Sequence, residues 1–246
     1  TLQHRFATPF LDHTFWPQLT RGAVHEFFLL GDSDTPPPPP ATPSRSARRH
    51  WLPPLTLLAL LAARGGGENS AGKCLWVGRS CWPSFQLLCA ALAETGLTPD
   101  QLLDRCVFID PPKDEDRFWA IGEALRCRSL RAVVADASRI TEAASRRLQL
   151  AAESSGVMAL LARPPWERAQ ASWAATRWNI RPCSSPALQP RWDVELLRKK
   201  GWDSAQTRPH RWILDCEYHA FLGACDIRVD ALHPPAGGQN ETARSA

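Results

Sequence analysis

The stretch GAVHEFFLLG, residues 22–31, decides the fold that the sequence predicts. Its apolar run lies between two glycines, which is typical of a short strand buried in a sheet. A strand of this kind opens many nucleotide-binding α/β cores, where a glycine-rich phosphate loop follows it directly. Here DSDTPPPPP, residues 32–40, follows the strand instead, and an Arg- and Ser-rich stretch continues to residue 49.

The proline run is unsuited to binding phosphate. A phosphate loop uses glycines so that successive backbone N–H groups point at the phosphates, and a lysine then reaches the β- and γ-oxygens. Five prolines remove five N–H donors and exclude the tight glycine turn. The sequence therefore predicts a nucleotide-binding scaffold that has lost its phosphate loop, and neither ATP nor Mg²⁺ is expected as a cofactor.

Strand-like and helix-like segments alternate after this opening. Continuous apolar runs predict strands at residues 74–78, 106–110, 131–136 and 156–162. Helices are expected between them, at residues 83–94, 98–103, 114–127 and 141–155, the last capped by Thr141. This alternation predicts a parallel sheet covered by helices on both faces.

The pattern changes near the C-terminal end. Polar and apolar residues alternate at residues 173–180, 191–197 and 211–215, which predicts antiparallel or edge strands. We expect a lead segment at residues 1–22 and a core at residues 23–185 that contains the Pro-rich loop 32–50. Residues 186–232 add strands to the same domain, and residues 233–246 are expected to form a disordered tail.

Several short motifs, taken in order, resemble the RecA family and most closely its ImuA branch. They are LTRGAVHE at 19–26, LTPDQLL at 97–103, VFIDP at 107–111, AVVADAS at 132–138, ELLRKKG at 195–201 and WILDCE at 212–217. The resemblance covers roughly residues 17–217 and implies a RecA-like three-layer α/β sandwich. It also implies a mainly parallel sheet, a degenerate nucleotide site and extra antiparallel strands at the C-terminal end.

The same resemblance implies a role and partners. ImuA proteins act with ImuB, a Y-family polymerase homologue that serves as an adaptor, and with ImuC, an error-prone polymerase. Together they support translesion synthesis and induced mutagenesis in the SOS response to DNA damage. The resemblance thus implies a cytoplasmic accessory factor, associated with the nucleoid when active, that binds an ImuB-like partner and has single-stranded DNA as a further candidate ligand.

The catalytic positions of RecA are altered here. Asp136 stands at the Walker B position, where RecA proteins hold Mg²⁺, and Gly31 and Asp32 stand where the phosphate loop would begin. RecA proteins also carry a glutamate shortly after the second strand, but residues 77–81 contain no carboxylate. Gly31, Asp32 and Asp136 are therefore interpreted as a vestigial nucleotide site. No catalytic residue and no enzymatic activity are expected.

Two alternatives stay open. The first is a RecA-type DNA-dependent ATPase with an unconventional phosphate loop, in which Lys73 or one of Arg45, Arg48 and Arg49 replaces the missing lysine. The second is a structural or regulatory RecA-like module that contacts neither DNA nor a polymerase.

Basic and aromatic residues gather after the fifth predicted strand. They are Arg163, Trp166, Arg168, Trp173, Arg177, Trp178 and Arg181. Arginine contacts phosphates and tryptophan stacks on unpaired bases, but both residue types also dominate protein interfaces. A DNA surface, a partner surface and a plain structural role are all compatible with this pattern, and the run 198–200 is ambiguous in the same way.

Other features favour ordinary structural roles. The net charge of +4 does not by itself imply nucleic acid, and the longest apolar run, residues 55–63, is too short to span a bilayer. The eight cysteines contain no C-x-x-C pair, so buried reduced thiols are expected rather than a metal site.

Three local patterns resemble functional motifs without the right context. GENSAGKC, residues 67–74, resembles a phosphate loop but follows a predicted helix and precedes a strand, so an exposed turn is expected. His25 and Glu26 are neighbours in a strand and point to opposite faces, which favours a strand-edge role over a catalytic pair. The acidic residues at 110–116 are interpreted as the start of a helix.

Overall fold

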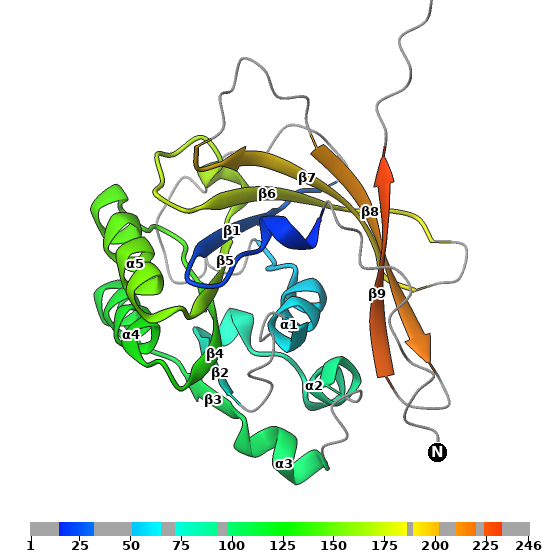
Figure 1. Cartoon of the computed structure of the whole chain (residues 1–246), viewed down its shortest axis with the longest axis horizontal. Coiled ribbons are helices and arrows are strands. Elements are labelled where there is room, and N and C mark those ends of the chain that lie inside the picture. The colour runs from blue at the N-terminus through cyan, green and yellow to red at the C-terminus, as the bar shows by residue number, and fades with distance from the viewer. Residues whose placement is uncertain are drawn as a thin grey trace, which may run out of the picture.

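The computed structural model describes residues 15–31, 51–64, 72–92, 98–185, 189–201, 210–219 and 224–232. Within these ranges, one nine-stranded sheet runs in the order β3-β2-β4-β5-β1-β6-β7-β8-β9 (Figure 1). The predicted tail, the Pro-rich segment and most of the lead segment lie outside the described residues.

The sheet has a parallel part and an antiparallel part. The mutually parallel strands are β1 (Val24–Leu29), β2 (Lys73–Val77), β3 (Cys106–Ile109), β4 (Leu130–Asp136), β5 (Met158–Arg163) and β6 (Thr176–Pro182). The antiparallel strands are β7 (Arg191–Lys199), β8 (His210–His219) and β9 (Ala224–Leu232). The predicted mostly parallel α/β sheet with antiparallel C-terminal strands is therefore confirmed.

Helices cover both faces of the parallel part. Helices α4 (Asp114–Arg126) and α5 (Glu142–Ser155) lie on one face, and α1 (Leu55–Arg64) and α2 (Phe85–Leu92) lie on the other, where β8 and β9 curve around them (Figure 1). A short helix, α3 (Pro99–Asp104), precedes β3. Each face has its own apolar core, so the arrangement is compatible with a three-layer sandwich.

Local signals in the sequence explain how α5 begins and ends. The Thr141 hydroxyl accepts a hydrogen bond from the backbone N–H of Ala144 at 3.2 Å, which confirms the predicted N-cap. Gly156 ends the helix in the left-handed conformation, with φ of 79°. The acidic cluster likewise begins α4, with Asp114, Glu115 and Asp116 in its first turn.

Strand β6 differs from its prediction as an antiparallel or edge strand. It lies inside the sheet, parallel to β1 and antiparallel to β7. Its polar residues do not face solvent, because Arg177 is ion-paired to Glu26 and the Asn179 amide donates a hydrogen bond to Glu195 at 3.0 Å. The alternation of polar and apolar residues predicted exposed polar side chains, but in β6 Arg177 and Asn179 are buried and bind polar partners within the protein.

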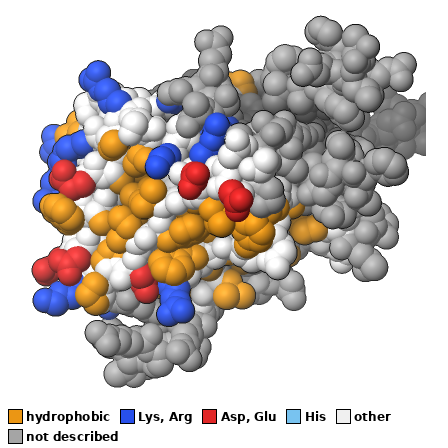
Figure 2. Space-filling view, turned by 90° about the horizontal axis from the view of Figure 1, so that it is seen from below, with side chains coloured by type: hydrophobic (Ala, Val, Ile, Leu, Met, Phe, Trp, Pro, Cys, Tyr) orange, Lys and Arg blue, Asp and Glu red, His pale blue; other side chains and the backbone are white. Residues whose placement is uncertain are grey.

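The other end of the sheet exposes hydrophobic side chains. Figure 2 views the molecule from below, the side on which α3 and β3 lie in Figure 1, and shows a band of hydrophobic side chains across it. Phe85, Leu103 and Val107, from α2, α3 and β3, are exposed hydrophobic residues.

None of the described helices has the length and apolar character needed to cross a membrane.

Candidate functional site

The candidate site lies at the carboxyl edge of the parallel strands. Because β1, β2, β4 and β5 run in the same direction, their carboxyl ends meet at one edge of the sheet. Gly31 follows β1 there and is exposed, and Asp136 ends β4. Asp32 and the Pro-rich segment lie outside the described residues, so Gly31 and Asp136 are the described members of the predicted vestigial site.

Both oxygens of Asp136 are already occupied by hydrogen bonds from the protein. Oδ2 accepts from the Ser80 hydroxyl at 3.0 Å, and Oδ1 accepts from the backbone N–H of Ser138 at 2.8 Å. Asp136 is only 4% exposed. Ser80 lies just after β2, where the comparison with RecA proteins would place a glutamate, and its hydroxyl donates a hydrogen bond to Asp136.

A buried guanidinium supplies positive charge beside Asp136. Arg117 on α4 is 2% exposed, and its Nη1 lies 3.9 Å from Asp136 Oδ2. Its Nη2 donates to the Ser138 carbonyl at 2.9 Å and pairs with Asp114 at 3.0 Å. A Mg²⁺ ion needs open oxygen ligands, whereas these surroundings offer donors and a cation. The hydrogen bonds from Ser80 and Ser138 and the adjacent Arg117 guanidinium therefore disfavour a metal ion at Asp136.

The end of β2 approaches Asp136 so closely that a side chain is excluded. Gly78 has φ of +86°, and a Cβ atom built there would lie 3.0 Å from the Asp136 Cβ. Only glycine satisfies both the backbone conformation and the contact. The hydrogen bond from Ser80 to Asp136 therefore depends on the backbone conformation at Gly78 as well as on the Ser80 hydroxyl.

Arg139 links Asp136 to a second polar cluster. It is the one non-glycine residue with positive φ, 65°, within the described ranges. Its backbone N–H donates to Glu167 Oε1 at 2.8 Å, and its Nη2 pairs with Asp114 Oδ2 at 2.5 Å. A left-handed residue costs about 1 kcal/mol, and these two interactions offset that cost.

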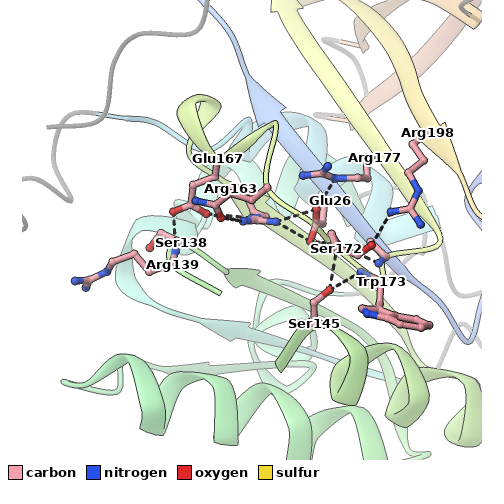
Figure 3. A network of polar contacts seen from close by, with 12 residues as sticks. Glu26, Ser138, Arg139, Ser145, Arg163, Glu167, Ser172, Trp173, Arg177 and Arg198 are labelled. Atoms are coloured by element: carbon pink, nitrogen blue, oxygen red, sulfur yellow. Dashed lines mark hydrogen bonds and ion pairs between the residues drawn. The ribbon is translucent and has the colours of Figure 1, made fainter. Parts of the chain in front are cut away.

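The second cluster is a buried ion-pair network centred on Glu26 in β1 (Figure 3). Arg163 Nη1 donates to both Glu26 oxygens at 3.1 Å. Arg177 Nε donates to Oε2 at 2.8 Å, and the Ser172 hydroxyl donates to Oε1 at 2.7 Å. These four residues are between 0% and 7% exposed. The predicted strand-edge role of Glu26 is wrong, because β1 lies between β5 and β6.

Glu167 extends this network toward Arg139. Its Oε2 accepts from Arg163 Nη2 at 2.8 Å and from Arg163 Nε at 3.1 Å. Burial raises the pKa of Glu167 in spite of the opposing field of Arg163. The network balances two carboxylates, Glu26 and Glu167, against two guanidiniums, Arg163 and Arg177, so its interior carries no net charge.

The predicted Arg/Trp surface is therefore divided between the core and the exterior. Arg163 and Trp178 are fully buried, so neither is available to contact DNA or a partner. Trp178 packs against Phe15 at 5.5 Å and Trp212 at 5.7 Å between ring centroids. Trp166 is half-buried against the same apolar core. Hydrophobic packing, rather than base stacking, accounts for both tryptophans.

Trp173 is the most exposed tryptophan of the predicted set, at 38%. Its indole N–H donates to Glu142 at 3.2 Å, and the Arg146 guanidinium lies 4.8 Å from its ring centroid. Both partners lie on α5. Trp173 is thus held on the surface by a hydrogen bond to Glu142 and a cation–π contact with Arg146.

The remaining arginines of the set meet at a shallow depression of about 570 Å³. It is lined by Arg168, Arg177, Asn179, Arg181, Glu195, Leu197 and Arg198. Arg181 pairs with Glu195 at 3.3 Å, and Arg198 donates to the Ser172 carbonyl at 2.6 Å. Arg177 is ion-paired to Glu26 and Arg181 to Glu195, so Arg168 and Arg198 give this depression its positive charge.

The sequence pattern did not predict the ion pairs of Glu26 and left the role of Arg198 undecided. A lone carboxylate inside an apolar run was the available signal for Glu26, since buried carboxylates require partners. Those partners are distant in sequence. Residues 67–74 resemble a phosphate loop in sequence. Of this segment, Lys73 and Cys74 begin strand β2, whereas the lysine of a phosphate loop lies at the start of a helix.

Comparison with protein-family models and with curated protein sequences finds no match to this chain. A search for three or more clustered His, Cys, Asp or Glu side chains finds no such metal-binding group among the described residues.

Proposed function

We propose that this chain is a non-catalytic RecA-like accessory factor of the DNA damage response. In this proposal it supports translesion synthesis through an ImuB-like polymerase adaptor and an ImuC-type polymerase. The observation that carries the proposal is the state of Asp136, whose two oxygens accept from Ser80 and Ser138 while Arg117 lies beside it. A nucleotide site kept for hydrolysis would leave this carboxylate open for Mg²⁺.

The topology supports a RecA-like origin of the scaffold. Strands β1 and β4 are parallel with β5 between them, so their carboxyl ends share one edge. A RecA-type site needs its phosphate loop and its Walker B carboxylate at the same edge. In this chain the ends of β1 and β4 lie at the same edge, as a RecA-type site would require. The prolines at residues 36–40 and the hydrogen bonds around Asp136 nevertheless disfavour nucleotide binding there.

The position of Lys73 weighs against one version of the ATPase alternative. Lys73 begins β2, whereas Asp136 lies at the far end of the neighbouring parallel strand β4. Four residues of strand separate the two ends of β2, which is roughly 13 Å. Lys73 is therefore at the wrong edge to replace a phosphate-loop lysine.

Nucleotide binding is the direct test. With fluorescent ATP and Mg²⁺, we expect no saturable binding by the purified chain, with or without single-stranded DNA, at concentrations that saturate RecA. Saturable binding that Asp136→Ala abolishes would overturn the proposal and favour an unconventional ATPase.

The partner is tested separately. Affinity capture of the chain from DNA-damaged cells is expected to recover a Y-family polymerase homologue. Recovery of no such protein, from cells in which it is expressed, would favour a structural or regulatory RecA-like module instead.

The cationic depression is the favoured contact for single-stranded DNA. Arg168→Ala combined with Arg198→Ala is expected to weaken binding and to reduce the slope of log K against log salt by about 1.4, since each lost phosphate contact removes about 0.7. Fluorescence anisotropy at several salt concentrations measures this slope. Arg177 is a poor choice for the test because it is ion-paired to buried Glu26.

A charge-matched variant controls for net charge. Arg126→Ala with Arg128→Ala removes the same two charges from the exposed end of α4 and the turn after it. Equal weakening by both double variants would show that the depression is not a specific contact.

A further inference from the structure

Two thiols lie next to each other at the amino ends of β2 and β3. Cys74 and Cys106 are register partners in this parallel pair, so their side chains project from the same face of the sheet. Both are free thiols, and both line a small cavity beside Trp76. Its water-accessible space is about 10 Å³, room for about one water-sized species.

A buried cation lines the same cavity. Arg131 is 6% exposed, and among the described residues its guanidinium forms no ion pair and its Nε has no hydrogen-bond partner. Arg105 also lines the cavity. A buried arginine with no ion pair among the described residues favours negative charge beside it, and two thiolates that share one monovalent cation would supply it.

We propose that Cys74 and Cys106 form a two-coordinate site for one soft monovalent cation of the Cu(I) class. Neighbouring strands lie about 4.8 Å apart. Two metal–sulfur bonds of about 2.3 Å in line span nearly that distance. Thiolate sulfur is a ligand that selects Cu(I).

The binding step balances without an oxidant or a reductant. Two S–H bonds break, two sulfur–copper bonds form, and two protons leave to solvent. The product carries one negative charge, which the Arg131 guanidinium neutralises. This site is remote from the carboxyl edge of the sheet and independent of the proposed function.

The test titrates Cu(I) into the full chain in the presence of excess glutathione, which removes the metal from single thiols. We expect the wild-type protein and Cys89→Ser to retain one equivalent, and Cys74→Ser and Cys106→Ser to bind at least about 10-fold more weakly, a difference of about 1.4 kcal/mol. Cys89 is the matched control, a half-buried cysteine on α2 that packs against the same core. X-ray absorption is expected to show two sulfur ligands.

Equal retention by all four proteins, or none by the wild type, would overturn the proposal. Alkylation of the wild-type chain decides the matter if the serine variants do not fold. Cu(I) must then slow the modification of Cys106 by iodoacetamide and leave the exposed Cys127 unaffected. Equal protection of both thiols would indicate only nonspecific metal binding.

Discussion

Replacing Glu26 with alanine is expected to lower the free energy of unfolding by about 3–5 kcal/mol. The substitution leaves the Arg163 and Arg177 guanidiniums, both at least nine-tenths buried, without the carboxylate that accepts from them. Glu167 would remain as the partner of Arg163, but Arg177 would have none of its present ion pairs. Since domains of this size are stable by about 5–15 kcal/mol, the loss is a large fraction of the total. Urea unfolding followed by circular dichroism measures it.

Glu123→Ala is the matched control. Glu123 forms an ion pair with Arg126, but its side chain is 49% exposed, so we expect a change below about 0.5 kcal/mol. Glu26→Gln keeps the shape of the side chain and loses its charge, and it should fall between the two. Similar small effects of Glu26→Ala and Glu123→Ala would show that the buried network contributes little to stability.

Acidification is expected to destabilise the protein through His25. This side chain is fully buried in β1, and burial lowers its pKa from 6.5 to about 4, against a smaller opposing contribution from the Thr20 carbonyl. The unfolded chain therefore takes up a proton between pH 6.5 and about 4 while the folded chain does not. Stability is unaffected by this group above pH 6.5 and falls by about 3 kcal/mol as the pH drops to about 4.

The hydrogen bonds of the His25 ring also disfavour its protonation. Nε2 lies 2.9 Å from the Thr20 carbonyl, to which it donates, so Nδ1 accepts from the Thr176 hydroxyl at 2.7 Å. A charged ring would place a second donor against Thr176, whose oxygen already accepts from the Trp178 indole N–H at 2.6 Å.

A variant without the titrating ring isolates this effect. His25→Gln can still donate to Thr20 but does not titrate, so its stability should change less than that of the wild type between pH 7 and pH 4.5. The difference between the two unfolding curves cancels the contributions of other groups, including Glu167, whose raised pKa acts in the opposite direction. Parallel pH profiles for the two proteins would contradict the assignment.

The Glu26 network and the Asp136 cluster form one continuous polar system along the carboxyl edge. Arg139 connects them, because its backbone N–H reaches Glu167 and its side chain reaches Asp114, the partner of Arg117. The edge that holds nucleotide in RecA-type proteins is here occupied by the protein's own donors and cations. These contacts support the proposed role in recognition rather than hydrolysis.

The sequence by itself determined the order of strands and helices. Apolar runs bounded by Gly and Pro place the strands, and Thr141 and Gly156 set the limits of α5, because these signals act over a few neighbouring residues. The sequence also shows that no glycine-rich phosphate loop directly follows residue 31, since the five prolines at 36–40 cannot donate N–H groups.

Tertiary structure alone decided which polar residues are buried and which residues they bind. Glu26 accepts from residues 137 to 151 positions away in the chain, and Asp136 accepts from a serine 56 positions away. Arg163 and Trp178 resemble a binding surface in sequence, yet parallel pairing of β1 with β5 and β6 places one in the ion-pair network and the other in the core. Burial and ion pairing depend on which strands become neighbours, and local sequence patterns do not contain that information.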